Sequence, residues 1–348
     1  YTLALRDTAP GGEPREQLRV VGAVQRVMVA EEDPNAVLER IAYPQTRIVS
    51  LTITEKGYSH EPATGHLRWD DPDILHDLDN PIRPRSAIGL LVYGLALRRE
   101  RGLPPLTLLS CDNLQANGDT LRSLVLAFAL RIDAALTGWI DKHCTFPNSM
   151  VDRIVPATRD EDRARIAQRL GVEDAWPVVG EPYLNWVIED KFAAGRPAWE
   201  AAGATFVTNA APYERLKLRM VNGPHSALAY LGGLLGIATI GEAAALPALR
   251  GFLDDMMRCE IAPTLKGIPD VGLEGYRHRF LGRVVNPELP QLTRQVAMDG
   301  SQKLPQRLLA TIRERLRGGD DIRRLALAVA AWLHYLRGVD EPGARHSI

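Results

Sequence analysis

Short apolar strands that alternate with amphipathic helices constrain the fold more than any other feature of this chain. Residues 47–54 and 106–111 are β-branched or leucine-rich runs of the kind that fills a buried parallel strand. Residues 86–101 and 118–136 carry a helical period of apolar side chains. This order, with short connections, predicts a parallel α/β sheet. Both strands run into polar residues, at 54–56 and 112–113, and the carboxyl ends of parallel strands are where such sheets bind ligands.

Beyond residue 147 the sequence changes character. Helix-length segments dominate there, and no convincing series of strands accompanies them. The predicted helices cover residues 160–170, 181–194, 213–236, 241–261, 302–317 and 322–337. The sequence therefore predicts two domains: an α/β domain over residues 1–147 and a mostly α-helical domain over residues 148–348.

Composition limits the classes of partner. Lysine and arginine total 42 and aspartate and glutamate 43, and this net charge of −1 argues against nucleic acid or a membrane surface as a partner. No apolar run approaches the roughly 20 residues that span a bilayer. The three cysteines, Cys111, Cys144 and Cys259, lie far apart, which favours a reduced, cytoplasmic protein. No His or Cys spacing typical of zinc is present, so we expect no metal. We expect a monomer or a small homo-oligomer.

The densest group of chemically useful side chains lies in residues 213–225. On a helix, Lys217, Asn222 and His225 fall within an arc of roughly 140°, and Glu214 precedes the lysine by three residues. A base, an amide and an imidazole on one face could serve catalysis. A solvated helix face with a Glu–Lys pair explains the same pattern, and spacing alone favours that alternative.

Three further groups have a functional and a structural interpretation. Asn113, after the second strand, could bind a carbonyl or a cofactor ring, or could be a turn asparagine. Asp152, with Val151 and Arg153, could bind a ligand or form an interdomain ion pair. Asp299 lies in a polar run ending at Lys303 and could simply cap the next helix.

Taken together, these segments resemble the polyol-specific long-chain dehydrogenases, the mannitol dehydrogenase and fructuronate reductase family. The matching stretches follow the family order over nearly the whole chain: residues 54–58, 112–118, 146–154, 186–190, the Lys217, Asn222 and His225 block, and 298–305. The resemblance implies a Rossmann-like dinucleotide-binding domain followed by a helical substrate and catalytic domain. It also implies oxidation of a secondary alcohol that is linked to NAD, with NADP possible, and independent of zinc.

The resemblance also implies a role for each matching residue. Lys217 matches the general base, Asn113 and Asn222 match the amides that hold the reacting oxygen, and His225 and Asp152 match binders of substrate hydroxyls. Lys303 reaches the far end of the substrate, with Arg294 nearby, and Glu214 lies on the proton path. Thr54, Glu55, Asn113 and Val151 match the cofactor-binding segments.

The physical chemistry of the lysine agrees with that role. Loss of a hydride from an alcohol needs a base, and it needs donors aimed at the oxygen that becomes negative. Lysine becomes a usable base when burial lowers its pKa, because desolvation penalises the ammonium. The apolar neighbours Leu216, Leu218 and Met220 predict such burial for Lys217.

The sequence departs from the family pattern in two places. No G-x-G-x-x-G turn precedes Leu51, and family chains continue beyond Ile348. We therefore expect that the first βαβ unit is missing and that the chain begins inside a longer protein. In addition, Pro224 should kink the helix that carries Asn222 and His225.

The substrate is left open between two classes. Gln295 stands where some mannitol dehydrogenases have arginine, and Arg294, Arg153 or Lys303 could pair with the carboxylate of a sugar acid. We place a neutral polyol of the mannitol type first and a mannonate-type sugar acid, the fructuronate reductase reaction, second. A degenerate homologue without catalysis is the third alternative.

Overall fold

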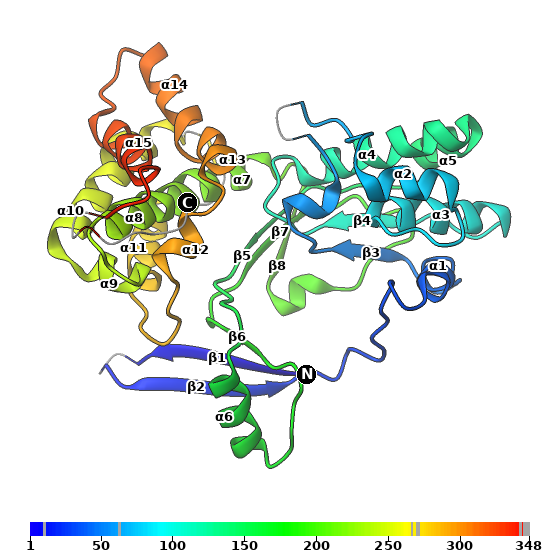
Figure 1. The fold of residues 1–348 in the computed structure, drawn as a ribbon, viewed down its shortest axis with the longest axis horizontal. Coiled ribbons are helices and arrows are strands. Elements are labelled where there is room, and N and C mark those ends of the chain that lie inside the picture. The colour runs from blue at the N-terminus through cyan, green and yellow to red at the C-terminus, as the bar shows by residue number, and fades with distance from the viewer. Residues whose placement is uncertain (10–11, 62–63, 266, 269–271, 341–342, 344–348) are drawn as a thin grey trace. The chain divides into compact units, whose positions relative to one another are not determined.

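A computed structural model describes residues 1–9, 12–61, 64–265, 267–268, 272–340 and 343. The chain forms two compact units (Figure 1), and each is described by itself. The α/β unit comprises residues 24–152 and 184–211, and the helical unit comprises residues 1–23, 153–183 and 212–348. This division differs from the predicted single boundary after residue 147. The chain crosses between units more than once because strand pairing returns distant segments to each unit.

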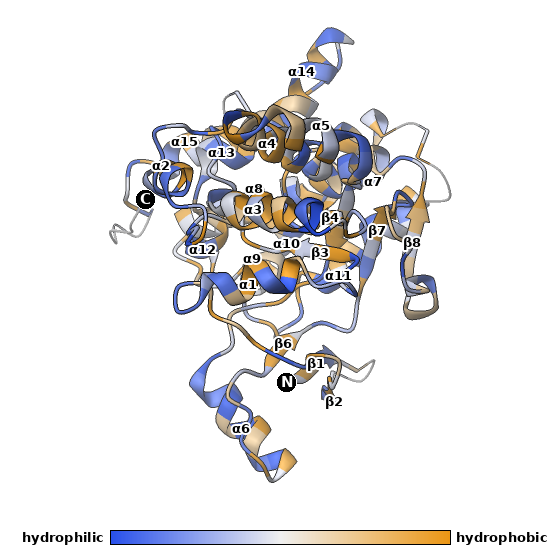
Figure 2. Ribbon diagram, turned by 90° about the vertical axis from the view of Figure 1, so that its right-hand side faces the viewer, coloured by the Kyte–Doolittle hydropathy of each residue, from blue (hydrophilic) through white to orange (hydrophobic). Residues whose placement is uncertain are grey.

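Two parallel strands organise the α/β unit, as the sequence predicts. They are β3 (Ile48–Leu51) and β4 (Thr107–Ser110), paired in register from Ile48 with Thr107 to Leu51 with Ser110. The helices of this unit are α1 (Pro34–Ile41), α2 (Pro72–Asp79), α3 (Ala87–Glu100), α4 (Asn117–Ile132) and α5 (Ala134–His143). One hydrophobic core joins buried side chains from all five helices and both strands. In Figure 2, α4 is hydrophobic along much of its length, which suits a helix that contributes to this core.

The predicted helices of this unit need one correction. Residues 86–101 form α3, and the Ser86 hydroxyl accepts a hydrogen bond from the Gly89 N–H at 2.9 Å as the N-cap. Residues 118–136, predicted as one helix, divide between α4 and α5. Asp133 causes the break, because it is extended and its carboxylate caps α5 by accepting from the Ala135 N–H at 2.7 Å.

A second sheet in the α/β unit was not predicted. It contains β5 (Ser149–Asp152), β7 (Asn185–Glu189) and β8 (Ala204–Val207), with β7 antiparallel to β5 and parallel to β8. The expectation of no strand series beyond residue 147 was therefore wrong, as was the helix over residues 181–194. Strands on both sides of β7 satisfy its backbone, and this pairing outweighs local helix propensity. A 3₁₀ turn, Trp199–Ala202, precedes β8.

The helical unit begins with a hairpin that the sequence analysis also missed. Strands β1 (Thr2–Thr8) and β2 (Pro14–Val20) are antiparallel, and β6 (Val178–Gly180) pairs parallel to β1. The predicted helix 160–170 is α6 (Asp160–Leu170), which is mostly hydrophilic in Figure 2. Arg6 of β1 joins these elements, because its guanidinium donates to Glu16 at 2.6 Å and to Asp162 at 2.7 Å.

We expect low pH to destabilise the ion-pair cluster of Arg6, Glu16 and Asp162. Burial alone raises the pKa of Glu16, but hydrogen bonds from Arg6 and Arg169 outweigh burial and hold that pKa below its ordinary value. The unfolded chain therefore takes up the proton first, so the stabilisation present above the ordinary glutamate pKa of about 4.3 is lost as pH falls through the native pKa. In urea unfolding, we expect Glu16→Gln to lower the free energy of unfolding at pH 7 by about 2 kcal/mol. We also expect that free energy to fall less steeply in the variant than in wild type as the pH is lowered to about 3. The exposed Glu13→Gln is the control, and an unchanged acid slope in Glu16→Gln would contradict the assignment.

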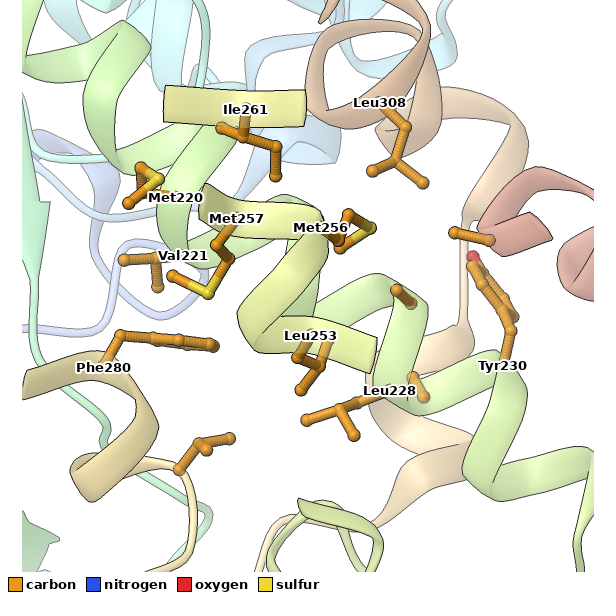
Figure 3. Packing of buried hydrophobic residues seen from close by; sticks show 14 of the residues in the cluster. Met220, Val221, Leu228, Tyr230, Leu253, Met256, Met257, Ile261, Phe280 and Leu308 are labelled. Atoms are coloured by element: carbon orange, nitrogen blue, oxygen red, sulfur yellow. The ribbon is translucent and has the colours of Figure 1, made fainter. Parts of the chain in front are cut away.

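The rest of this unit is helical, as predicted, but with interruptions. Its helices are α7 (Ala211–Lys217), α8 (Gly223–Leu234), α9 (Ile240–Ala245), α10 (Pro247–Asp255), α11 (Leu273–Arg283), α12 (Thr293–Ala297), α13 (Gly300–Leu304), α14 (Ala310–Arg317) and α15 (Arg323–Tyr335). Three π-helical turns, Leu218–Asn222, Met256–Ile261 and Pro305–Leu309, interrupt the predicted long helices. Figure 3 shows the core of this unit, where Leu228 of α8, Leu253 of α10 and Phe280 of α11 lie among Met220, Met256 and Met257.

Among the residues that the structure describes, no helix is long and apolar enough to cross a membrane.

Candidate active site

A π-helical turn builds the face that carries the predicted catalytic residues. The turn Leu218–Asn222, called the π turn below, lies between α7 and α8, and its closing bond runs from the Gly223 N–H to the Leu218 carbonyl, five residues back. Side chains five residues apart lie on the same side of such a turn, so Lys217 and Asn222 share a side. Pro224, which cannot donate a hydrogen bond, lies in the first turn of α8. The structure thus accommodates the proline through a π turn, a local geometry frequent at functional sites.

Lys217 is buried at the end of α7. Its exposed fraction is 7%, and the neighbours Leu216, Leu218 and Met220 are buried as well. The predicted burial is confirmed, and the solvated-face alternative does not hold for this lysine. Glu214, one turn earlier on α7, is half-buried.

Asn222 and His225 extend the same face by one turn of α8. The Asn222 Oδ1 atom is buried and has no hydrogen-bond partner among the described residues. A buried acceptor left unpaired costs free energy, so such an atom marks a place for a ligand donor. The His225 ring is half-buried and packs edge-to-face on Phe280, with ring centroids 6.2 Å apart. The arrangement offers a base, an amide and an imidazole beside an apolar core.

The polar candidates of the α/β unit lie at the carboxyl ends of β3 and β4, as predicted. One buried carboxylate, Asp112, organises them. It accepts from the Ile53 N–H at 3.0 Å, from the Thr54 N–H at 2.9 Å and from the Tyr58 hydroxyl at 2.8 Å. These bonds hold Thr54 at φ 60°, a strained conformation for a residue other than glycine, at the start of the 3₁₀ turn Glu55–Tyr58. The exposed Asn113 follows directly.

The side-chain amide of Asn117 links the carboxyl end of β4 to β5. Asn117 donates from Nδ2 to the carbonyls of Ser110 at 3.0 Å, Asp112 at 3.1 Å and Ser149 at 3.0 Å. Strand β5 carries the half-buried Val151 and the buried Asp152. Within this unit, the hydrogen bonds of Asp112 and Asn117 thus join Thr54, the end of β4 and the start of β5.

We expect Asp112→Asn to loosen this network. An asparagine side chain offers one acceptor oxygen in place of two, so one of the N–H donors of residues 53–54 would lose its partner, at about 1–2 kcal/mol of stability. Because Asp112 bonds to Ile53, Thr54 and Tyr58, we expect it to act on a ligand only through these neighbours, as a positioning residue. We expect the Kd for NAD⁺ to rise about 10-fold in calorimetric titration, with Tyr58→Phe giving a smaller change. The exposed Asp70→Asn should leave both quantities unchanged, and an unaltered Kd in Asp112→Asn would rule out this role.

Lys303 and Arg294, the predicted binders of the far end of the substrate, have different surroundings in the helical unit. Lys303 donates from Nζ to the Met298 carbonyl at 2.6 Å. Arg294 is exposed and borders a cavity of about 330 Å³ that also includes Trp332.

The packing of α12 places Arg294 near the end of α8. The adjacent Thr293 bonds to the Ile237 carbonyl at 2.8 Å, and an added Cβ at Gly232 would lie 3.3 Å from the Thr293 methyl group. Gly232 lies about 10 Å along α8 from His225. The structure therefore does not bring the backbone of Arg294 to the face that carries His225.

Sequence analysis missed a buried cation beside this face. Arg307, in the π-helical turn Pro305–Leu309, is 9% exposed and donates from Nη1 to the Ser226 hydroxyl at 3.1 Å. Its carbonyl oxygen would lie 2.9 Å from a Cβ at Gly223, so it packs on the first turn of α8. The sequence signal was available, because Arg307 follows Lys303 by four residues.

No three His, Cys, Asp or Glu side chains gather closely enough to hold a metal ion within the part of the chain that the structure describes.

Family models match both halves of the chain. The model of the mannitol dehydrogenase Rossmann domain matches residues 5–201, and the model of the mannitol dehydrogenase C-terminal domain matches residues 209–348. These matches confirm the predicted fold class, an α/β Rossmann-like part followed by a mostly helical part.

Named relatives agree with the family models. The chain is 46% identical to D-mannonate oxidoreductase of Escherichia coli strain K12, over 97% of this chain and 70% of that protein. It is 44% identical to mannitol 2-dehydrogenase of Phaeosphaeria nodorum strain SN15, over 93% of this chain and 58% of that protein. Among solved structures, the ternary complex of Pseudomonas fluorescens mannitol 2-dehydrogenase with NAD and D-mannitol matches at TM-score 0.90 and 39% identity, over 100% of this chain and 70% of that one. With both halves matched, the chain belongs to the mannitol dehydrogenase family of oxidoreductases.

Proposed function

We propose that the protein oxidises a secondary alcohol of a polyol, in the manner of mannitol to fructose, with NAD or NADP as the hydride acceptor, and catalyses the reverse reduction. The sugar-acid reaction of the fructuronate reductase type is the alternative. The observation that carries the proposal is the buried Lys217, which lies on the same side of the π turn as the Asn222 amide.

In the proposed mechanism, Lys217 acts as the base. Its neutral amine takes the proton of the substrate hydroxyl as the hydrogen on the same carbon leaves with its electron pair, so the alcohol becomes a ketone and the lysine becomes an ammonium. The Asn222 amide donates to the oxygen as negative charge develops, without a titration of its own. The apolar side chains around Lys217 exclude water and strengthen these interactions.

Further residues take the roles that the family resemblance implies. His225 and Asp152 bind substrate hydroxyls, Asn113 supplies the second amide, and Lys303, with Arg294, serves the far end of the substrate. Glu214, half-buried one turn before Lys217, passes the proton onward to solvent.

The cofactor that the family implies suits the α/β unit. Exposed polar groups at the carboxyl ends of β3 and β4, held by the Asp112 network, are a donor set for one end of a nicotinamide dinucleotide. Thr54, Glu55, Asn113 and Val151 would hold it there. When bound, the nicotinamide accepts the hydride.

The test is absorbance at the band of reduced nicotinamide after NAD⁺ or NADP⁺ is mixed with the protein and D-mannitol, D-arabinitol, D-sorbitol or D-mannonate in parallel wells. Reduction of the cofactor with at least one substrate is expected. No reduction of the cofactor with any of the four substrates, from protein that circular dichroism shows to be folded, would favour the alternative of a homologue without catalysis.

A further inference from the structure

We propose that the α/β unit holds a second ligand site, a cavity that binds a phosphorylated sugar. The site goes beyond the proposed function, because none of the residues that line it is among the predicted cofactor and substrate residues. The cavity has a volume of about 570 Å³, which lies within the range of roughly 300–1,000 Å³ that is typical of small-molecule sites. It is bordered by the segment that enters α1, by α2 and by the loop from α2 to α3, and both α1 and α2 pack on α3 (Figure 1).

Opposite charges line the cavity without neutralising one another. The two cations and two anions of the lining are Arg83, Arg85, Glu31 and Asp73. No ion pair joins these side chains to each other or to any other residue that the structure describes. By contrast, the exposed Arg101 of the same unit pairs with Glu39 at 2.7 Å. Unpaired charges of both signs around one cavity favour a ligand that carries complementary groups.

A buried carboxylate fixes the loop that carries both arginines. Asp77 of α2 is fully buried and accepts from the Arg85 N–H at 2.7 Å, from the Ser86 N–H at 2.9 Å and from the Ser86 hydroxyl at 2.7 Å. The buried Pro84, between the two arginines, restricts the backbone further. The backbone of this loop is therefore positioned before a ligand arrives, which lowers the entropic cost of binding.

The side chains of the cavity suit a phosphate group joined to a hydroxylated body. Guanidinium groups match phosphate oxygens in bidentate pairs, so the two arginines suit a phosphate monoester. Carboxylates only accept hydrogen bonds, so Glu31 and Asp73 suit sugar hydroxyls, which donate. His76 and Asn80 add an imidazole and an amide, and none of the described residues that line the cavity is a Phe, Tyr or Trp on which a nucleobase could stack. A sugar phosphate therefore satisfies the lining better than free phosphate or a nucleotide does.

Calorimetric titration in phosphate-free buffer tests the site, with D-glucose 6-phosphate, D-glucose and inorganic phosphate as separate ligands. We expect D-glucose 6-phosphate to bind with a Kd below about 1 mM, and the other two to bind at least about 10-fold more weakly. Arg83→Gln and Arg85→Gln should each raise the Kd for D-glucose 6-phosphate about 10-fold. Asp73→Asn should raise it about 3-fold without weakening the binding of phosphate. Arg47→Gln, which removes an exposed arginine of the same unit outside the cavity, is the matched control and should leave the Kd unchanged.

Two further titrations identify the site and its ligand. An unchanged Kd for D-glucose 6-phosphate in excess NAD⁺ supports a site separate from the cofactor, whereas displacement by NAD⁺ would overturn the inference. Tighter binding of adenosine 5′-monophosphate than of D-glucose 6-phosphate would overturn the assignment to a sugar. No binding at about 10 mM, equal affinity for phosphate alone, or a Kd that neither arginine variant alters would overturn the site itself. None of these measurements depends on turnover, so their outcome is distinct from that of the test of the proposed function.

Discussion

Replacing Lys217 with alanine should abolish turnover and leave the fold intact. The side chain is buried, and in the proposed mechanism no other group takes the hydroxyl proton, so we expect kcat to fall by about 10³-fold or more. Binding of substrate should change much less, because the lysine acts mainly in the transition state.

The controls for this prediction separate chemistry from folding. Lys217→Ala should still unfold cooperatively in urea, with a midpoint close to or moderately below that of wild type, because truncation of a buried side chain leaves a small cavity. Lys142→Ala, at an exposed site on α5, should keep full activity. Retention of most of the activity by Lys217→Ala would show that another group is the base.

The second large effect concerns the stability of the α/β unit. Arg98 on α3 is fully buried, and its guanidinium donates to the Pro104 carbonyl at 2.6 Å, the Ile41 carbonyl at 3.0 Å and the Tyr43 carbonyl at 2.8 Å. The last carbonyls of a helix have no partners within the helix, and Arg98 supplies donors at the end of α1. It thereby fastens α1 and the segment before β4 to α3.

Arg98→Met should therefore lower the free energy of unfolding by about 3 kcal/mol, because a side chain of similar length keeps the packing but removes the donors for three carbonyls. Burial lowers the pKa of Arg98, so part of the loss is offset by no longer burying a charge. Urea denaturation followed by circular dichroism measures the change. Arg99→Met, at a partly exposed arginine paired with Asp133, should cost below about 1 kcal/mol. A difference below about 0.5 kcal/mol between Arg98→Met and wild type would show that the carbonyls find other donors.

Elements whose burial pattern is local were predictable from sequence. Strands β3 and β4 are short apolar runs, and α3, Ala87–Glu100, lies within the predicted helix 86–101. The hairpin β1–β2 escaped notice because β2 is mostly exposed and holds its place through pairing and through Arg6, which are non-local interactions. Strand β7 was mistaken for helix for the same reason, since its partners β5 and β8 lie elsewhere in the sequence.

The candidate site divides in the same way. The family resemblance supplied Lys217, Asn222 and His225, and helical spacing placed them loosely together. The π turn between Lys217 and Asn222 is closed by a bond from the Gly223 N–H to the Leu218 carbonyl, and no periodicity of side chains predicts that bond. Arg307 lies in the predicted helix 302–317, where the sequence gives no sign of its burial, and only its tertiary packing on Gly223 and Ser226 shows it to be buried.

The central claim is that the Lys217 amine is the base, and chemical rescue tests it most directly. Small primary amines of increasing pKa would be added to Lys217→Ala with NAD⁺ and substrate, with Lys142→Ala as the control. The account predicts that activity returns in proportion to amine concentration and that the rescued rate rises with amine basicity. Failure of every amine to restore activity in a folded Lys217→Ala protein that still binds substrate, or rescue that is independent of basicity, would contradict it.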